Sequence, residues 1–241
     1  MSDKYSTAQP SGSERDPRPR SRSGCAAAAA VAQKRRAPAE VPGPQDRNSS
    51  VSEKTHILIL GGYGLIGRQI TAACLAAGHK VTSAGRSPDT GRRLIPDARW
   101  IGIDLNEATL AAHWQPHLEG IDVVINASGA LQSGGRDDLA KIQRDAIRAL
   151  TIACEKAGIK TFVQISAPGA TPDAATEFMA TKGAADETLR ASSLDWIILK
   201  PGLVIAPTAY GGTSLLRTLA AIPWVQPVVL GDAQVQTVAV A

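Results

Sequence analysis

From residue 55 onward, short apolar runs alternate with longer segments whose apolar residues recur at helical spacing. Six runs predict strands: THILIL (55–60), KVTSAG (80–85), ARWIGIDL (98–105), IDVVINAS (121–128), TFVQIS (161–166) and LDWIILKPG (194–202). Between the first two runs, LIGRQITAACLAAG predicts a helix that ends at Gly78. Between the fourth and fifth, residues 137–158 predict a longer helix, with apolar positions at Leu139, Ile142, Ala146 and Leu150.

No short hairpin turns join the predicted strands, so their connections must cross over the sheet. This order is typical of a doubly wound α/β domain of the Rossmann type, in which helices cover both faces of a parallel sheet. The sequence therefore predicts one such domain over residues 54–241. Within residues 203–241, TSLLRTLAAIPW (213–224) predicts an amphipathic helix.

Residues 1–53 differ in composition from the rest of the chain. They are rich in Ser, Pro, Arg and Ala and contain few large apolar side chains, so they cannot bury enough surface to offset chain entropy. We expect a disordered tail here. A solvated tail or an over-extended start of translation is favoured over a targeting or nucleic-acid-binding arm.

The charge distribution bears on possible partners. Residues 1–53 hold nine Lys and Arg against six Asp and Glu, whereas the remainder holds 17 against 16. The predicted domain is thus nearly neutral, and its aromatic content is low, with 4% for the whole chain. We therefore expect no nucleic-acid partner.

Cysteine, histidine and hydropathy patterns limit the protein class further. The three cysteines, Cys25, Cys74 and Cys154, are far apart and form no disulfide or zinc pattern, which suits a reducing cytoplasm. His113 and His117 are four residues apart, but Pro116 intervenes, so a solvated loop is favoured over a metal site. The chain contains no apolar run of membrane-spanning length, so a cytoplasmic protein with no membrane span is expected.

The stretch LILGGYGLIGRQI (58–70) carries the clearest functional pattern. Gly61, Gly64 and Gly67 form a GxxGxxG motif directly after a strand and at the start of a helix, which is the context of dinucleotide binding. Gly61 would permit the tight turn, Gly64 the approach of the pyrophosphate, and Gly67 the packing of helix on strand. The residues predicted to bind the cofactor here are Gly61, Tyr63, Gly64, Leu65, Ile66 and Gly67.

The end of the second strand indicates which dinucleotide is bound. An NAD site usually has an acidic residue here, whereas an NADP site has a cation against the 2′-phosphate. Arg86 follows this strand with no acidic neighbour, which favours NADP over NAD, although Arg86 could also be a solvated loop residue. Asp104 could accept from the adenine amino group or cap a helix. Ala127, Ser128 and Gly129, in NASG at the end of the fourth strand, are expected along the cofactor ribose.

With these motifs the chain resembles the atypical and extended short-chain dehydrogenase/reductase superfamily. The resemblance covers residue 55 onward and rests on GGYGLIG, AGRSP, GIDL, NASG, QISAPGA, FMATK and DWIILKPG. The superfamily includes sugar-nucleotide epimerase-like proteins, nitrogen-metabolite-regulator-like sensors and the accessory NADPH-binding subunit of respiratory complex I. The resemblance implies a Rossmann fold and a bound nicotinamide dinucleotide. It also implies that residues 203–241 form an abbreviated substrate-side segment.

The resemblance also implies a catalytic set. Active members use a Tyr as proton donor, a Lys four residues later that binds the nicotinamide ribose, and a Ser that hydrogen-bonds the carbonyl. The matching positions are Ser166 and Lys182, but the tyrosine position holds Phe178, which has no proton to donate. Tyr210 is a possible substitute donor, although a surface tyrosine is the favoured interpretation.

Two functions follow. The first is an NADP(H)-binding oxidoreductase acting on a small carbonyl or alcohol, with Ser166 orienting the carbonyl and Lys182 holding the ribose. The alternative is a non-catalytic redox sensor or assembly factor that binds the dinucleotide, which Phe178 favours.

Overall fold

A computed structural model describes residues 31–34, 54–206, 217–222 and 236–239. All six predicted strands are present and parallel, at β2 (His56–Leu60), β3 (Lys80–Gly85), β4 (Arg99–Gly102), β5 (Val123–Asn126), β6 (Thr161–Ile165) and β7 (Asp195–Lys200). They lie side by side in the order β4-β3-β2-β5-β6-β7, which is the 3-2-1-4-5-6 order of a Rossmann sheet. The predicted doubly wound α/β fold is confirmed.

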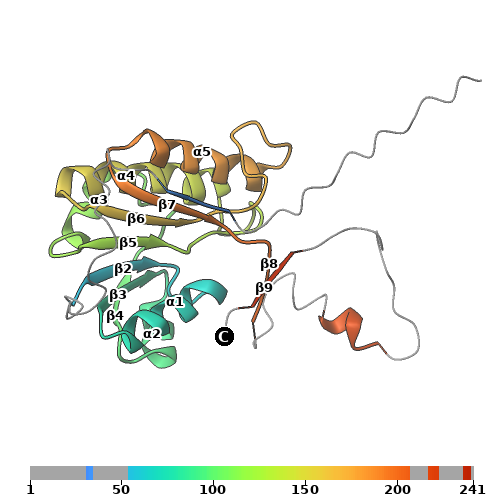
Figure 1. The fold of residues 1–241 in the computed structure, drawn as a ribbon, viewed down its shortest axis with the longest axis horizontal. Coiled ribbons are helices and arrows are strands. Elements are labelled where there is room, and N and C mark those ends of the chain that lie inside the picture. The colour runs from blue at the N-terminus through green and yellow to red at the C-terminus, as the bar shows by residue number, and fades with distance from the viewer. Residues whose placement is uncertain (1–30, 35–53, 207–216, 223–235, 240–241) are drawn as a thin grey trace, which may run out of the picture.

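Helices cover both faces of this sheet (Figure 1). One face packs against α3 (Ala111–Trp114), α4 (Ala146–Ala157) and α5 (Glu177–Ala191), with Trp114, Phe162 and Leu150 among its fully buried side chains. The other packs against α1 (Leu65–Ala76) and α2 (Pro88–Leu94). Two apolar cores therefore hold the strands, and the carboxyl ends of β2, β3 and β5 meet at one edge of the sheet.

The long helix predicted over residues 137–158 is not uniform. It begins with a π-helical turn, Ala140–Asp145, and becomes α-helical only at Ala146. It ends at Gly158, whose φ of 71° matches the predicted stop. A further difference concerns His113 and His117, which lie in α3 and in the 3-10 turn Gln115–His117 rather than in a loop.

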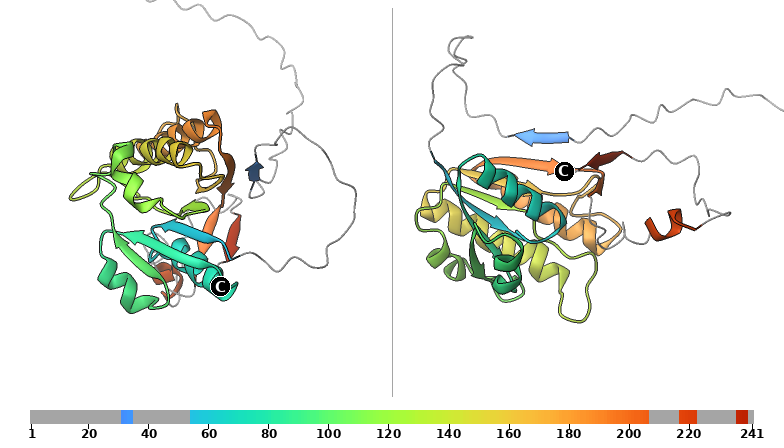
Figure 2. Two further views of the ribbon diagram at one scale, coloured as in Figure 1. Left: turned by 90° about the vertical axis from the view of Figure 1, so that its left-hand side faces the viewer. Right: turned by 90° about the horizontal axis from the view of Figure 1, so that it is seen from below.

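The expected tail contains one ordered element that the sequence did not predict. Residues Val31–Lys34 form β1, which pairs antiparallel with β7, beside it in Figure 2. The unpaired backbone groups along the outer edge of β7 explain how a short segment without a hydrophobic pattern can be held there. The other residues of 1–53 lie outside the described part of the chain.

Two short strands follow the sheet. β8 (Leu203–Ile205) pairs in parallel with β9 (Thr237–Ala239), a pairing that the sequence did not indicate. Of the helix predicted over 213–224, only residues 217–222 are described, and they begin with four helical residues. Tyr210 lies outside the described residues. None of the helices described is long and apolar enough to cross a bilayer.

Candidate cofactor site

In the turn after β2, neither Gly61 nor Gly67 could be replaced by a residue with a side chain without a clash. Gly61 has a φ of 71°, and a Cβ there would lie 2.8 Å from the carbonyl oxygen of Ala127 at the end of β5. A Cβ at Gly67 would overlap the Gly61 carbonyl. The first glycine therefore brings the turn against β5, and the last brings α1 against the turn, as the motif predicts.

The first turn of α1 presents free backbone donors at this edge. Gly64 is the N-cap residue, has no side chain to cap the helix, and donates its own N–H to Gly61 over 2.9 Å. The first helical bond is from Arg68 to Gly64, so the N–H groups of Leu65, Ile66 and Gly67 have no carbonyl one turn earlier in the helix. Such donors at the positive end of a helix dipole fit a pyrophosphate.

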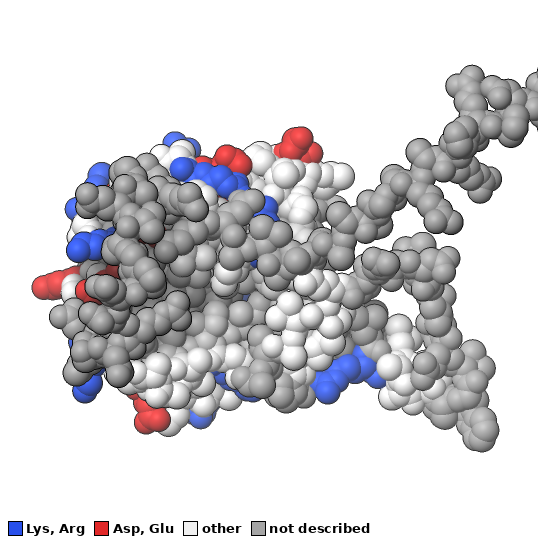
Figure 3. All heavy atoms as spheres, viewed as in Figure 1, with Lys and Arg blue, Asp and Glu red and all other residues white. Residues whose placement is uncertain are grey.

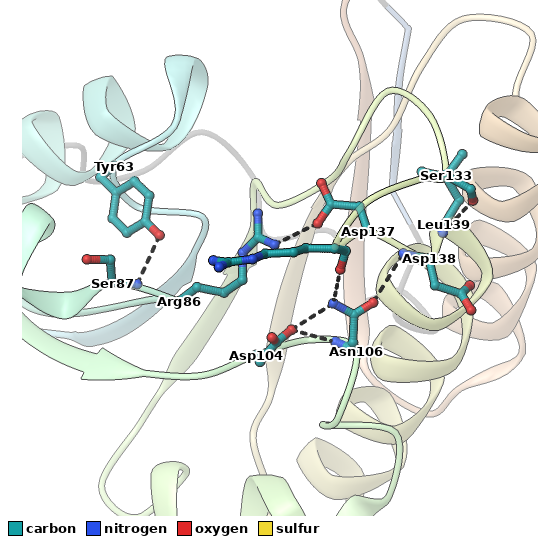
Figure 4. A network of polar contacts seen from close by, with 10 residues as sticks. Tyr63, Arg86, Ser87, Asp104, Asn106, Ser133, Asp137, Asp138 and Leu139 are labelled. Carbon is teal, nitrogen blue, oxygen red and sulfur yellow. Dashed lines mark hydrogen bonds and ion pairs between the residues drawn. The ribbon is translucent and has the colours of Figure 1, made fainter.

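Tyr63 points from this turn across the end of β3 (Figure 4). Its hydroxyl accepts from the Ser87 N–H at 3.2 Å, and its ring centre lies 5.8 Å from that of Trp100. A Cβ at Gly85 would overlap the Tyr63 ring. Tyr63 therefore forms a wall beside Arg86, where the adenosine half of a dinucleotide would lie.

Arg86 extends from the end of β3 toward the loop that follows β5. Its Nη1 lies 2.7 Å from Oδ1 of Asp137, and the Arg86 and Asp137 side chains are 48% and 28% exposed. The sequence predicted Arg86 either against a phosphate or in a solvated loop, and partial exposure agrees with both. The ion pair with Asp137 is a contact that the sequence did not indicate. The Arg86 guanidinium thus lies at the end of β3, paired with the Asp137 carboxylate.

Asp104 follows β4 on the same side of the site. Its Oδ1 accepts from the backbone N–H and the side-chain Nδ2 of Asn106, at 3.0 and 2.9 Å. The carboxylate therefore shapes its own loop, and no helix begins there for it to cap. Asp104 is exposed, and its contact with adenine stays a prediction.

On the other side of the glycine turn, the segment after β5 is fixed by Asn126. Oδ1 of this side chain accepts from the N–H and hydroxyl of Ser128, at 3.0 and 2.5 Å, while its Nδ2 donates to Gln164. A Cβ added to the exposed Gly129 would lie 3.6 Å from Nζ of Lys182. The structure thus brings Ser128, Gly129 and Lys182 together beside the glycine turn.

Lys182 is buried on α5. Its Nζ donates to the Ile165 carbonyl at 3.1 Å and lies 5.6 Å from the centre of the Phe178 ring. Burial lowers the pKa of Lys182 to about 8, and the negative charge of Asp186 partly opposes this effect. The ammonium is therefore mostly retained at neutral pH and has donors left for a ribose hydroxyl.

The Ser166 hydroxyl is committed to a residue that sequence reasoning missed. It donates to Oδ2 of Asp186 at 2.7 Å, and Lys200 Nζ lies 3.3 Å from the same oxygen. Asp186 is fully buried, and its Oδ1 has no hydrogen-bond partner. Burial raises the pKa of Asp186, whereas the Ser166 hydrogen bond and Lys200 lower it. Asp186 lies four residues after Lys182 on the same helix, and this spacing could have indicated that it faces the site.

Gln143 is a second buried polar residue that the sequence did not single out. It lies in the π-helical turn, where Nε2 donates to the Ala130 carbonyl at 2.5 Å and Oε1 accepts from Thr181 at 3.2 Å. It therefore joins the segment after β5 to α5, one residue before Lys182. Its position within an otherwise apolar helix face could have indicated this role.

Comparison with known families decides which kind of site this is. A family model described as NAD(P)H-binding matches residues 61–217, more than half of the chain. The chain belongs to the NAD(P)H-binding family. It is an NAD(P)H-binding Rossmann domain of the atypical short-chain dehydrogenase/reductase and epimerase-like superfamily, which confirms the resemblance and the binding of a nicotinamide dinucleotide.

Among curated relatives, photosystem II assembly factor Ycf39 of Synechocystis is 33% identical over 147 residues, which are 60% of this chain and 43% of that protein. Pinoresinol reductase 2 of Arabidopsis thaliana is 32% identical over 88 residues, which are 34% of this chain and 27% of that protein. The chain thus spans less than half the length of these relatives.

Solved structures show the same fold. The Bordetella bronchiseptica enzyme WbmG in complex with NAD matches with a TM-score of 0.59 and 18% identity, over 71% of this chain and 61% of that one. The oxidoreductase ylbE from Lactococcus lactis matches with a TM-score of 0.53 and 24% identity, over 65% of this chain and 73% of that one.

Proposed function

We propose that this chain binds NADPH in preference to NADH. The observation that carries the proposal is the Arg86 guanidinium, which lies at the end of β3, is 48% exposed and forms an ion pair with Asp137 at 2.7 Å. A guanidinium presents a planar fork of N–H donors, which binds a phosphate group through two parallel hydrogen bonds. The 2′-phosphate of NADPH is such a partner. The α1 amides and Lys182 would hold the pyrophosphate and the nicotinamide ribose.

The first candidate activity is oxidation or reduction of a small alcohol or carbonyl. The bound dinucleotide would supply or accept the hydride, while Lys182 positions the nicotinamide ribose through its ammonium. Phe178 cannot donate a proton, so a carbonyl must be polarised by Ser166 or by water. Ser166 could do so only after its hydroxyl leaves Asp186.

The second candidate is a non-catalytic redox sensor or assembly factor. It is favoured by the phenyl ring at position 178 together with the commitment of the Ser166 proton to Asp186. The similarity to the assembly factor Ycf39 agrees with it. In this case the binding of dinucleotide would set the shape of the protein rather than start a reaction.

Location and partners belong to the same proposal. The thiols of Cys74 and Cys154 are both free, which suits a reducing cytoplasm. On the face in Figure 3, the described Lys and Arg side chains are interspersed with Asp and Glu, which supports the expectation of no nucleic-acid partner.

The preference is tested by titrating the full chain with NADPH and with NADH while following protein fluorescence. Arg86→Ala should weaken NADPH binding at least tenfold and leave NADH nearly unchanged, because a hydrogen bond to a charged group contributes about 1.5–3 kcal/mol. Arg92→Ala is the matched control, since Arg92 is exposed and pairs with Asp89 in its own helix. An unchanged preference in Arg86→Ala would refute the assignment.

Turnover is tested separately with a panel of small aldehydes and ketones at saturating NADPH, following its absorbance. Consumption of NADPH supports the first candidate. Tight binding without consumption supports the second.

A further inference from the structure

The loop that follows β5 contains a polar strap, residues 131–138, which contacts Arg86 through Asp137. Backbone bonds between Gly134 and Asp137, at 2.8 and 3.0 Å, close its tip into a tight turn. Residues 131–136 are exposed, and Asp137 is half-buried. The strap therefore has its own local structure, which does not depend on the Asp137 carboxylate.

Two further anchors hold the strap at its ends. Asn106, in the loop after β4, donates through Nδ2 to the Arg136 carbonyl at 2.9 Å and accepts from the Asp138 N–H at 3.2 Å. On the side of α5, the Ser133 hydroxyl donates to Glu177 at 3.0 Å. These contacts place the Asp137 carboxylate opposite Arg86, as Figure 4 shows.

The 2.7 Å pair between Arg86 and Asp137 thus joins the two sides of the site. Asp137 occupies Nη1 of the same guanidinium that a 2′-phosphate would need. Because the pair is solvated on both sides, a phosphate with nearly two negative charges can displace the carboxylate. A 2′-hydroxyl, as in NADH, has no charge with which to do so.

We infer that Asp137 is a specificity-determining residue of the cofactor site: its carboxylate competes with the 2′-phosphate of NADPH for the Arg86 guanidinium and so reduces the preference for NADPH. The inference rests on the proposed function, in which Arg86 binds that phosphate. Asp137 lies 51 residues from Arg86 in the sequence, and only the strap brings the two together.

The test compares full-chain wild type with Asp137→Asn, which keeps the side-chain shape and the backbone turn but removes the charge. We expect NADPH and the fragment 2′,5′-ADP to bind about 2- to 5-fold more tightly, the range of an exposed ion pair, with NADH unchanged. Asp138→Asn is the control, because the Asp138 side chain accepts from the Lys141 N–H rather than from Arg86, and Asn can accept that hydrogen bond too.

A double variant separates this inference from the proposed function. In an Arg86→Ala background, Asp137→Asn should no longer change NADPH affinity. If Arg86→Ala abolishes the preference but Asp137→Asn binds NADPH as wild type does, or as Asp138→Asn does, the competition by Asp137 is refuted and the role of Arg86 stands. If Arg86→Ala keeps the preference, the proposed function itself fails.

Discussion

The Ser166 hydroxyl and the buried Asp186 carboxylate lie 2.7 Å apart, beneath the residues expected to handle the nicotinamide end of the cofactor. The contact links the end of β6 to α5, and Lys200 reaches the same carboxylate from the end of β7. Three elements of the site are therefore held by one anion. In this structure the Ser166 hydroxyl donates to Asp186. A substrate carbonyl would have to compete with this carboxylate for the same proton.

This arrangement predicts that Asp186→Asn destabilises the fold. The amide cannot balance the charge of Lys200 and leaves buried polar groups less well paired, so the free energy of unfolding should fall by about 1–3 kcal/mol. Urea unfolding measures this loss. Glu187→Gln, at an exposed neighbouring position, should cost less than about 0.5 kcal/mol. Equal stability of the two variants would contradict the structural role of Asp186.

The lowered pKa of Lys182 predicts a rise in stability at alkaline pH. The ordinary pKa is 10.5 and the folded value about 8, so the unfolded chain binds this proton more strongly. Between pH 8 and pH 10.5 the folded state loses this buried charge while the unfolded chain keeps it. The free energy of unfolding should therefore rise by up to about 3 kcal/mol. Urea unfolding should show this rise relative to Lys182→Met, and no comparable rise relative to the exposed Lys156→Met. Parallel pH profiles for all three proteins would contradict it.

Substitution by Ala should destabilise the fold by different amounts at two glycines, Gly61 and Gly78, that have similar backbone angles. Gly78→Ala adds a side chain at a φ of 84° in open space, which should cost about 1–2 kcal/mol. Gly61→Ala adds a side chain at a φ of 71°, where its Cβ also overlaps the end of β5. Its cost in stability should therefore be larger, and NAD(P)H binding should be lost. Thermal unfolding and cofactor titration measure both effects. Retained binding in Gly61→Ala would show that the turn is not the cradle.

Position 178 decides whether the missing proton donor limits turnover. Phe178→Tyr places a hydroxyl on the ring that lies 5.6 Å from the Lys182 ammonium. We expect this variant to reduce small carbonyls with NADPH at least tenfold faster than wild type, because a positioned general acid contributes about 10²–10⁴-fold. The double variant Phe178→Tyr with Lys182→Met should lose the gain. No gain in a variant that still binds NADPH would favour the sensor.

The sequence predicted the sheet well because each strand has its own apolar run and the glycine motif has a local backbone cause. It could not predict the Arg86–Asp137 pair or the Ser166–Asp186 bond, whose partners come from separate elements and carry no pattern in the chain. The π-helical turn was missed for a related reason, since the spacing of Leu139, Ile142 and Ala146 fits an ordinary helix. β1 was missed because its pairing is provided by the edge of β7.

We propose that the amides at the start of α1 and the Arg86 guanidinium together hold NADPH. Isothermal titration calorimetry of the full chain with NADPH, and then with NADH, tests it most directly. We expect one saturable site per chain, with NADPH binding more tightly than NADH. No saturable heat with either dinucleotide, confirmed by the absence of any cofactor-induced rise in melting temperature, would contradict it.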